Sequence, residues 1–314
     1  MARQTAVRRI AWKDYGSLFG LIGIALVLGL LTDRFFSLGN IVNIARQVSI
    51  NAIIAMGMTL VIITGGIDLS VGSLVALCGC VGIITMNASG SDGIGIVAGL
   101  SVGAAVGFLT GFFVGYCKIP PFIATLAMLT IARGVALVIT EGQPIVRFES
   151  PYRWLGEGDV LGLPVPILIM LVILGLIYFL LRHTPLGSYI YAAGGNEEAA
   201  RLSGVKVKRV KSIVYVVSGL CCGISGMILT ARLGSAQPNT GEGFELDAIA
   251  AVVLGGTSLM GGKGKLWGTL VGVFIIGVLN NGFNLLNVSP FYQLIAKGCV
   301  IILAVLVDQF LKRK

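Results

Sequence analysis

The long apolar runs of this chain limit its fold more than any other feature. A helix needs about 20 mostly apolar residues to cross a membrane, and about ten runs near that length follow one another. Charged residues form 12% of the 314 residues, whereas roughly 25% is typical of a soluble domain. A soluble globule would therefore lack the polar side chains to cover its surface, and the sequence predicts an all-α polytopic membrane protein. The runs lie at residues 17–31, 42–64, 69–86, 94–116, 122–140, 165–181, 213–231, 247–262, 267–287 and 292–310.

The basic residues predict how these runs are oriented. Cytoplasmic loops of membrane proteins are rich in Lys and Arg, and most of the 23 basic residues fall on the cytoplasmic side if both termini lie there. Many of them lie in a loop at 182–211. No small-residue cleavage site follows the first run, so we interpret it as a retained span of one transmembrane domain, residues 1–314. The net charge of +9 fits loops that face anionic membrane lipids and does not indicate binding to nucleic acid.

Two segments depart from a regular span. The run at 247–262 is short for a full crossing, so it either crosses or re-enters the membrane. The sequence GGIDLS at 65–70 predicts a helix break, with backbone that packs against protein or a water-filled path. Residues 51–66 also resemble residues 247–256, which leaves a parallel internal repeat open.

Glycines recur every four residues in one predicted span. This spacing places them on one face of the helix, where another backbone can approach closely. Such a stripe either packs against a helix or lines a substrate path, and we favour packing. The stripe consists of Gly95, Gly99, Gly103, Gly107, Gly111 and Gly115.

The residues needed for catalysis or metal binding do not cluster in the sequence. His183 is the single histidine and ends an apolar run, and the six cysteines form no CxxC pair. The phosphate-binding pattern GxxxxGK[ST] does not occur. We expect no catalytic residue, no metal site and no cofactor, and we interpret the chain as a protein without enzymatic activity of its own.

Ionisable residues within membrane spans mark coupling sites in many ion-driven carriers. Asp68 follows two glycines and precedes Ser70, so it either caps the helix break or serves as such a site. Other ionisable residues lie near span ends, where snorkelling to the interface explains them. These are Arg46, Arg133, Lys297 and Asp308.

Neutral polar residues also lie within the spans. They can hydrogen-bond a polyol in a path, or they can join neighbouring helices. The sequence leaves both interpretations open for Asn51, Thr64 and Asn281.

A short polar segment, GGNEEAARLSG at 194–204, interrupts this apolar chain. Asn196 is a good N-cap, and Glu197 and Glu198 occupy the first turn, where the helix dipole favours acidic groups. Arg201 lies four residues after Glu197, a spacing that predicts an ion pair, and Gly204 is placed to end the helix. We therefore predict a capped helix over 197–203.

The side chains of this short helix leave two interpretations open. Ala199 and Ala200 form a low surface between charged residues, and Leu202 adds an apolar contact. The helix either sits in a groove of a partner protein or rests on the membrane surface.

Three motifs together resemble the permease subunits of bacterial ABC importers for monosaccharides. They are NAIIAMGMTLVIITGGIDLSVGSL, GGNEEAARLSGV and ELDAIAAVVLGGTSLMGGKG, and the likeness extends over residues 35–308. Within the family, the chain is most similar to permeases for ribose. Permeases for xylose, arabinose, galactose or autoinducer-2 share much of this pattern.

The resemblance implies a set of partners and a place in the bacterial cell (inner) membrane. Two permease copies would form the path, an ATPase subunit would bind each copy in the cytoplasm, and a sugar-binding protein would dock outside the cell. The segments around Asp68 and Ser70, and from Asp247 to Gly262, would lie near the path or its gate. The helix that contacts the ATPase would comprise Asn196, Glu197, Glu198, Ala199, Ala200, Arg201, Leu202, Ser203 and Gly204.

Two other classes of protein compete with this interpretation. An ion-coupled secondary sugar carrier would need an essential carboxylate within the membrane, for which Asp68 is the strongest candidate. A membrane enzyme of lipid metabolism would need a catalytic constellation, which the sequence does not provide.

Overall fold

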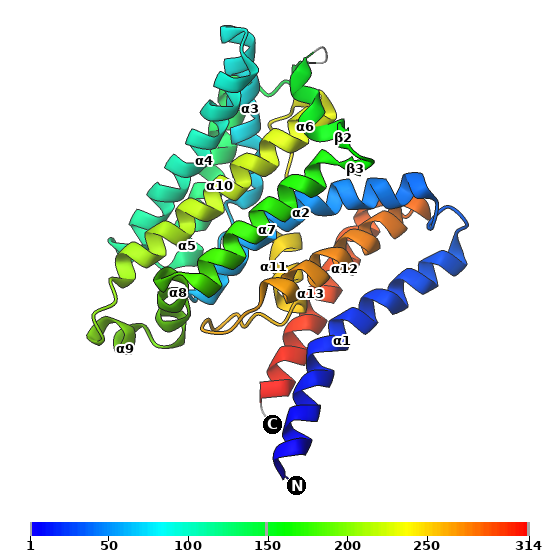
Figure 1. Cartoon of the computed structure of the whole chain (residues 1–314). Coiled ribbons are helices and arrows are strands. Elements are labelled where there is room, and N and C mark those ends of the chain that lie inside the picture. Colours follow the sequence, from blue (N-terminus) through cyan, green and yellow to red (C-terminus); the bar gives the residue numbers. More distant parts are fainter. Residues whose placement is uncertain (1, 148–149, 313–314) are drawn as a thin grey trace.

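The computed structural model describes the backbone of residues 2–147 and 150–312. It describes the surroundings of the side chains for residues 16–147, 150–300 and 302. Each apolar run of the sequence corresponds to a helix (Figure 1). Within the described residues, seven helices are long and apolar enough to cross a membrane. The helices that correspond to the runs are α1 (Ala2–Leu31), α2 (Leu38–Ile63), α3 (Val71–Ser89), α4 (Asp92–Gly115), α5 (Pro121–Thr140), α7 (Val165–His183), α10 (Val207–Leu233), α11 (Phe244–Leu254), α12 (Leu266–Leu285) and α13 (Pro290–Lys312).

Shorter elements connect the long helices at the two ends of the molecule. At the upper end in Figure 1, the 3-10 helix η1 (Pro151–Arg153) and α6 (Trp154–Glu157) precede an antiparallel hairpin of β2 (Asp159–Val160) and β3 (Leu163–Pro164). Strand β1 (Ile145–Val146) pairs antiparallel with β4 (Ser235–Ala236), so that Ile145 lies opposite Ala236. At the lower end lie α8 (Pro185–Gly195) and α9 (Glu197–Leu202).

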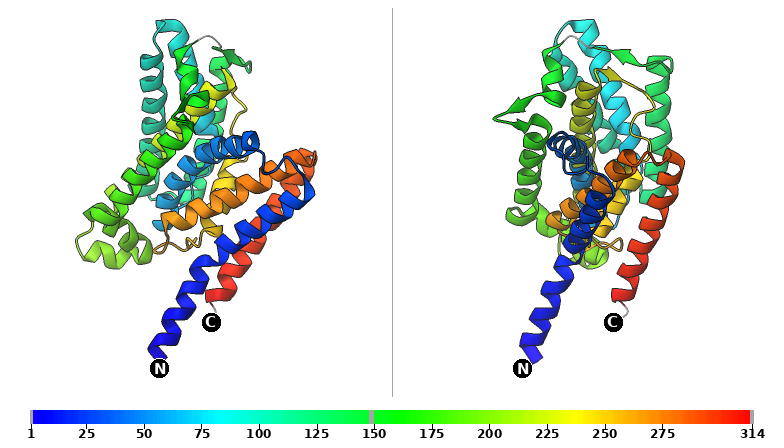
Figure 2. Two further views of the ribbon diagram at one scale, coloured as in Figure 1. Left: turned by 45° about the vertical axis from the view of Figure 1, so that its right-hand side comes forward. Right: turned by 90° about the vertical axis from the view of Figure 1, so that its right-hand side faces the viewer.

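The outer ends of α1 and α13 point toward the end of the molecule that carries α9. Figure 1 and the two views of Figure 2 show the amino end of α1 and the carboxyl end of α13 projecting downward, in the direction of α8 and α9. The arrangement agrees with termini that share a side with the basic loop at 182–211.

Helix α2 forms the centre of the protein. In its most apolar stretch 83% of the residues are buried, against 28% in α4, α5 and α7. It packs against α7, α10, α11 and α12. Its neighbours shield it, whereas α4, α5 and α7 keep large apolar side chains exposed, as helices that face lipid do.

The glycine stripe packs α4 directly against two other backbones, as the sequence predicts. A Cβ atom on Gly99 would lie 2.8 Å from the Cys78 carbonyl oxygen of α3, and one on Gly111 would lie 2.6 Å from the Cα atom of Ser212 on α10. A Cβ atom on Gly107 would overlap the Tyr215 carbonyl oxygen. Real Cβ atoms do not approach other atoms this closely, so the contact of α4 with α3 and α10 requires glycine.

The length of helix α11 bears on the two interpretations of the run at 247–262. The helix has 11 residues, so at about 1.5 Å per residue it covers roughly half of a hydrocarbon core of about 30 Å. The helix ends at Leu254, and the rest of the run is turn and irregular backbone. Figure 1 shows the chain descending from the upper end of α10 to the lower end of α11, so the upper part of this passage is the non-helical segment 234–243. The run therefore does not form one helix long enough to cross.

The two similar segments, 51–66 and 247–256, end with the same backbone hydrogen bonds. After α2, the amides of Gly65 and Gly66 donate to the carbonyls of Ile62 and Val61. After α11, the amides of Gly256 and Thr257 donate to Val253 and Val252 in the same way. Gly65 and Gly256 have φ angles of 79° and 83°, as this C-terminal motif requires. The likeness of the sequences therefore extends to their local structure.

We predict that filling the glycine stripe destabilises the protein. Gly107→Ala should lower the free energy of unfolding by about 1–3 kcal/mol through overpacking against α10, and Gly107→Leu should prevent folding. Gly134→Ala on α5 is the control, because no atom lies within 4 Å of a Cβ at that position. The measurement is thermal unfolding in detergent, and equal melting temperatures for the two alanine variants would contradict the prediction.

Candidate functional site

The polar segment at 194–204 forms a short capped helix, close to the prediction. Helix α9 runs from Glu197 to Leu202, and the Asn196 side chain accepts a hydrogen bond of 2.9 Å from the Ala199 amide. At the other end, the amides of Gly204 and Val205 donate to the carbonyls of Arg201 and Ala200. Gly204 has a φ angle of 87°, so glycine permits the turn that ends the helix.

The ion pairs of α9 differ from the prediction. The expected pair between Glu197 and Arg201 is wrong, because Arg201 binds Glu198 with contacts of 3.0 and 2.5 Å. Glu197 instead accepts a hydrogen bond of 2.7 Å from Lys211 on α10. The hydrogen bond from Arg201 lowers the pKa of the Glu198 carboxyl, so this group is charged at neutral pH.

The two alanines of α9 face opposite ways, which corrects the expected low surface. Ala200 is buried in a small apolar cluster with Ala193 of α8 and Val207 of α10. Ala199 is exposed, and Leu202 is 75% exposed. Helix α9 is therefore held by its own chain on one side and offers the other side to a partner or to the membrane surface.

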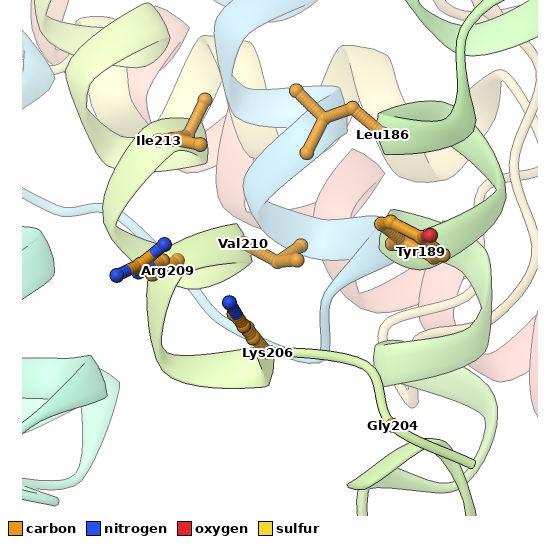
Figure 3. A pocket seen from close by; sticks show the side chains of 7 residues that line it. All are labelled: Leu186, Tyr189, Gly204, Lys206, Arg209, Val210 and Ile213. Carbon is orange, nitrogen blue, oxygen red and sulfur yellow. The ribbon is translucent and has the colours of Figure 1, made fainter.

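A cavity of about 350 Å³ lies beside α9, between α8 and α10 (Figure 3). We call it the α8–α10 cavity. The α8 residues lie opposite the α10 residues, and Gly204, which ends α9, lies at its lower edge. It is lined by Leu186, Tyr189, Gly204, Lys206, Arg209, Val210 and Ile213.

The helix break at 65–70 places Asp68 in a buried site made of serines. One carboxylate oxygen of Asp68 accepts hydrogen bonds from the Ser70 amide at 3.0 Å and the Ser70 hydroxyl at 2.6 Å. The other accepts one of 3.0 Å from Ser218 on α10. Asp68 is not the N-cap of α3, since Ser70 occupies that position without a side-chain cap. The carboxylate instead joins the break to α10, and the Thr64 hydroxyl donates to the Val61 carbonyl within its own turn.

The polar residues near α11 and α12 form two separate connections. Asp247 on α11 binds Lys297 of α13 at 2.9 Å and accepts a hydrogen bond of 3.2 Å from Asn280. Asn281 exchanges two hydrogen bonds with Asn40 at the start of α2, at 2.8 and 3.0 Å. These side chains join helices.

Asn51 differs from the other candidates for a path. It lies on α2 and is 9% exposed. Within the part of the chain that the structure describes, its side chain makes no hydrogen bond, although Ser225 bonds the neighbouring carbonyl of Ile50. Six residues are candidates for the path, namely Asn51, Thr64, Asp68, Ser70, Asp247 and Asn281. Among these six, and within the described part of the chain, Asn51 is the residue whose side chain is free to bind another molecule.

The two non-helical segments meet at the start of α3 and α11. A Cβ atom on Gly72 would overlap the Gly241 carbonyl oxygen and would lie 2.5 Å from the Glu245 carboxylate. The breaks at 64–70 and 234–243 therefore bring two helix N-termini together, although they are far apart in sequence. The sequence predicts one of these breaks and gives no sign that they touch.

Snorkelling is the wrong explanation for two of the ionisable residues. The Arg133 guanidinium of α5 donates to the carbonyls of Pro238 and Thr240 and so holds the segment before α11. Lys297 pairs with Asp247. Arg46 donates to the Glu157 carbonyl at 2.9 Å, and Asp308 lies outside the residues whose side chains are described.

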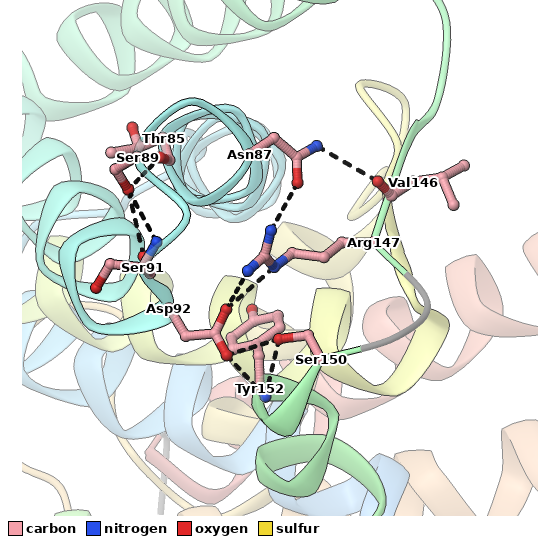
Figure 4. A network of polar contacts seen from close by, with 9 residues as sticks. All are labelled: Thr85, Asn87, Ser89, Ser91, Asp92, Val146, Arg147, Ser150 and Tyr152. Carbon is pink, nitrogen blue, oxygen red and sulfur yellow. Dashed lines mark hydrogen bonds and ion pairs between the residues drawn. The ribbon is translucent and has the colours of Figure 1, made fainter.

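A polar network at the upper end fixes the connection between α5 and α7 (Figure 4). Asp92, at the start of α4, binds Arg147 at 2.5 Å and accepts hydrogen bonds from the Ser150 hydroxyl and the Tyr152 amide. The Tyr152 hydroxyl bonds Thr230 of α10 at 2.5 Å, and burial raises the pKa of this phenol, so it stays protonated. Sequence analysis missed this network, because its members are far apart in the sequence and share no motif.

Comparisons with known proteins find permease components of transport systems. A family model described as "Branched-chain amino acid transport system / permease component" matches residues 40–305. The ribose import permease protein RbsC of Escherichia coli (strain K12) is 50% identical over 303 residues, which cover 95% of this chain and 94% of that protein. Its namesake in Bacillus subtilis (strain 168) is 50% identical over 313 residues, covering 98% and 97%. The D-allose transport system permease protein AlsC of Escherichia coli (strain K12) is 39% identical over 304 residues, covering 96% and 93%. No solved structure matches the chain significantly.

We predict that Asp68 stabilises the fold through its hydrogen bonds. Asp68→Ala leaves the buried donors of Ser70 and Ser218 unpaired, so the free energy of unfolding should fall by about 1–3 kcal/mol for each. Asp68→Asn keeps a carboxamide oxygen as an acceptor and should lose less. Thermal unfolding in detergent checks this, with Asp33→Ala as the control at an exposed loop carboxylate. An Asp68→Ala variant as stable as the control would contradict the prediction.

Proposed function

The chain belongs to the family of transport-system permease components, and from this premise we propose that it is the membrane subunit of an ATP-driven importer that carries ribose into the cytoplasm. The observation that carries the proposal is the 50% identity, over almost the whole length of both chains, with proteins named ribose import permease. Permease proteins named for allose and arabinose are 39% and 38% identical. Ribose is therefore our first choice, and a similar monosaccharide is the alternative.

We propose that α9 is the helix through which a separate ATPase subunit acts. Its exposed side carries Glu198, Ala199 and Leu202, and its buried side is joined to α10 by Ala200 and by the pair of Glu197 with Lys211. A push on α9 would therefore reach α10 directly. The contact of Ala200 and the ion pair of Glu197 with Lys211 define the orientation of this short helix. A helix with a fixed orientation is better suited to bind a partner protein than to lie on a membrane surface.

For the topology, we propose ten crossings in one domain, residues 1–314, with both termini and the loop 182–211 in the cytoplasm. The shared position of the two termini and α9 in Figure 1 supports this arrangement. In this topology, residues 234–254 form one of the ten crossings, and about half of that crossing is helical.

For the translocation path, we propose the region where α3 and α11 begin. Non-helical backbone at membrane depth is tolerated where it is buried or lines a cavity, and the N-termini of half-helices are suited to hold polar substrate groups. Asp68, Ser70 and Asp247 would hold the shape of this region through their bonds to other helices, whereas Asn51 would be free to contact sugar.

The proposed partners complete the importer. A second copy of the chain would form the other half of the path, an ATPase would bind α9 of each copy, and an extracytoplasmic sugar-binding protein would dock at the end that carries α6 and β2–β3. An ion-coupled carrier is the second candidate, and the bonds of Asp68 to Ser70 and Ser218 argue against it, because a coupling carboxylate must be free to exchange ions.

We predict that ribose uptake requires the whole assembly. Labelled ribose should enter proteoliposomes only when the chain is combined with the ATPase, the binding protein and ATP. Uptake by the chain alone under an ion gradient would support the carrier instead. Uptake of another monosaccharide by the complete assembly would correct the substrate and leave the mechanism in place.

We predict that Glu198→Arg abolishes ATP-driven uptake and releases the ATPase, while membrane insertion is unchanged. The substitution places two arginines three residues apart and reverses the charge of the exposed surface. Co-purification of the ATPase and uptake assays check the result.

A charge-swapped variant separates the contact from the stability of α9. Glu198→Arg combined with Arg201→Glu can restore the ion pair but not the charge pattern that a partner meets, so uptake should stay low. Recovery of uptake in the double variant would assign Glu198 a structural role and would remove it from the proposed interface.

A further inference from the structure

The basic residues that begin α10 fall into two groups. Lys211 is bound to Glu197, and the Lys208 ammonium lies 5.7 Å from the centre of the Tyr116 ring. Lys206 and Arg209 line the α8–α10 cavity, and neither makes an ion pair or side-chain hydrogen bond with another described residue. The cavity thus presents two positive charges that the rest of the described chain does not neutralise.

The start of α10 adds a further positive element. No side chain among the described residues caps this end of the helix. The amides of Val207 and Arg209 donate to the carbonyls of Val205 and Lys206, so it is the dipole of α10, rather than a set of free amides, that favours an anion here. The two cations and the helix end lie at the same edge of the cavity (Figure 3), so their effects add.

The opposite part of the cavity is apolar. Leu186 and the ring of Tyr189 on α8 face Val210 and Ile213 on α10 (Figure 3). Tyr189 and Ile213 are 43% and 42% exposed, so an apolar occupant would cover surface that now faces outward. A free phosphate ion would satisfy the cations and leave these walls uncovered.

We propose that the α8–α10 cavity binds an anionic phospholipid of the cytoplasmic leaflet. Its phosphate lies between Lys206 and Arg209, and its acyl chains run along Leu186, Val210 and Ile213. Basic pockets between membrane helices on the cytoplasmic side recognise anionic headgroups in this way. Because Gly204 also lines the cavity, the lipid contacts the end of α9.

The test compares lipids on the purified full-length chain. It is mixed in detergent with equal amounts of dioleoyl phosphatidylglycerol and dioleoyl phosphatidylcholine, and bound lipid is counted by native mass spectrometry. Phosphatidylglycerol should predominate, and Lys206→Gln combined with Arg209→Gln should lower its affinity about fivefold for each cation removed. Arg209→Lys should keep most of the binding.

A matched control removes the same charge elsewhere on the lower end of the molecule. Arg182→Gln combined with Lys263→Gln changes two exposed cations outside the cavity and should leave the phosphatidylglycerol preference intact. Equal loss in both double variants would reduce the effect to net charge and overturn the proposal.

Two further outcomes would also overturn it. Displacement of the lipid by excess inorganic phosphate would make this a phosphate site without a role for the apolar walls. Loss of the phosphatidylglycerol preference when the ATPase is bound would assign the cavity to that partner. Retention of the preference in both experiments is the expected result.

Discussion

The close contact of α4 with α3 and α10 is the constraint on which the rest of the structure depends. Between membrane helices, water provides no hydrophobic drive, so association relies on packing and on hydrogen bonds. The glycine stripe lets backbones touch, and Ser212 of α10 donates a hydrogen bond of 3.0 Å to the Gly111 carbonyl across the same contact. Helix α10 is thereby fixed along most of its length.

Helix α10 connects the functional regions because it is held so firmly. Lys211 near its lower end binds α9, Ser218 binds the break at Asp68, and Thr230 near its upper end binds Tyr152. We expect a helix with these attachments to move as one body. A displacement of α9 would therefore act on the break and on the upper connection together, which is what an alternating path needs.

The sequence predicts the long helices well, because the length of an apolar run nearly determines the length of a span. It also predicts the local features of α9, since Asn196 and Gly204 act through their own backbone. The prediction from sequence fails where a residue from a distant segment takes the place of a local partner. Glu197 has Arg201 at an ideal spacing, yet it binds Lys211, which the fold brings beside it. For the same reason, the carbonyl partners of Arg133 and the lysine partner of Asp247 could not be foreseen.

The bonds within the breaks also bear on where the energy for transport enters. A carboxylate that drives transport by binding an ion must exchange its ligands during each cycle, and doing so at Asp68 would leave buried hydroxyl donors unpaired at a cost of about 1–3 kcal/mol each. The contact of Asp247 with Lys297 and Asn280 sets a similar barrier. Both groups are suited to keep the starts of α3 and α11 in place while the segments around them shift. We therefore expect the work on the path to come from outside the membrane. We expect it to pass through α9, which is exposed on one side and bound to α10 on the other.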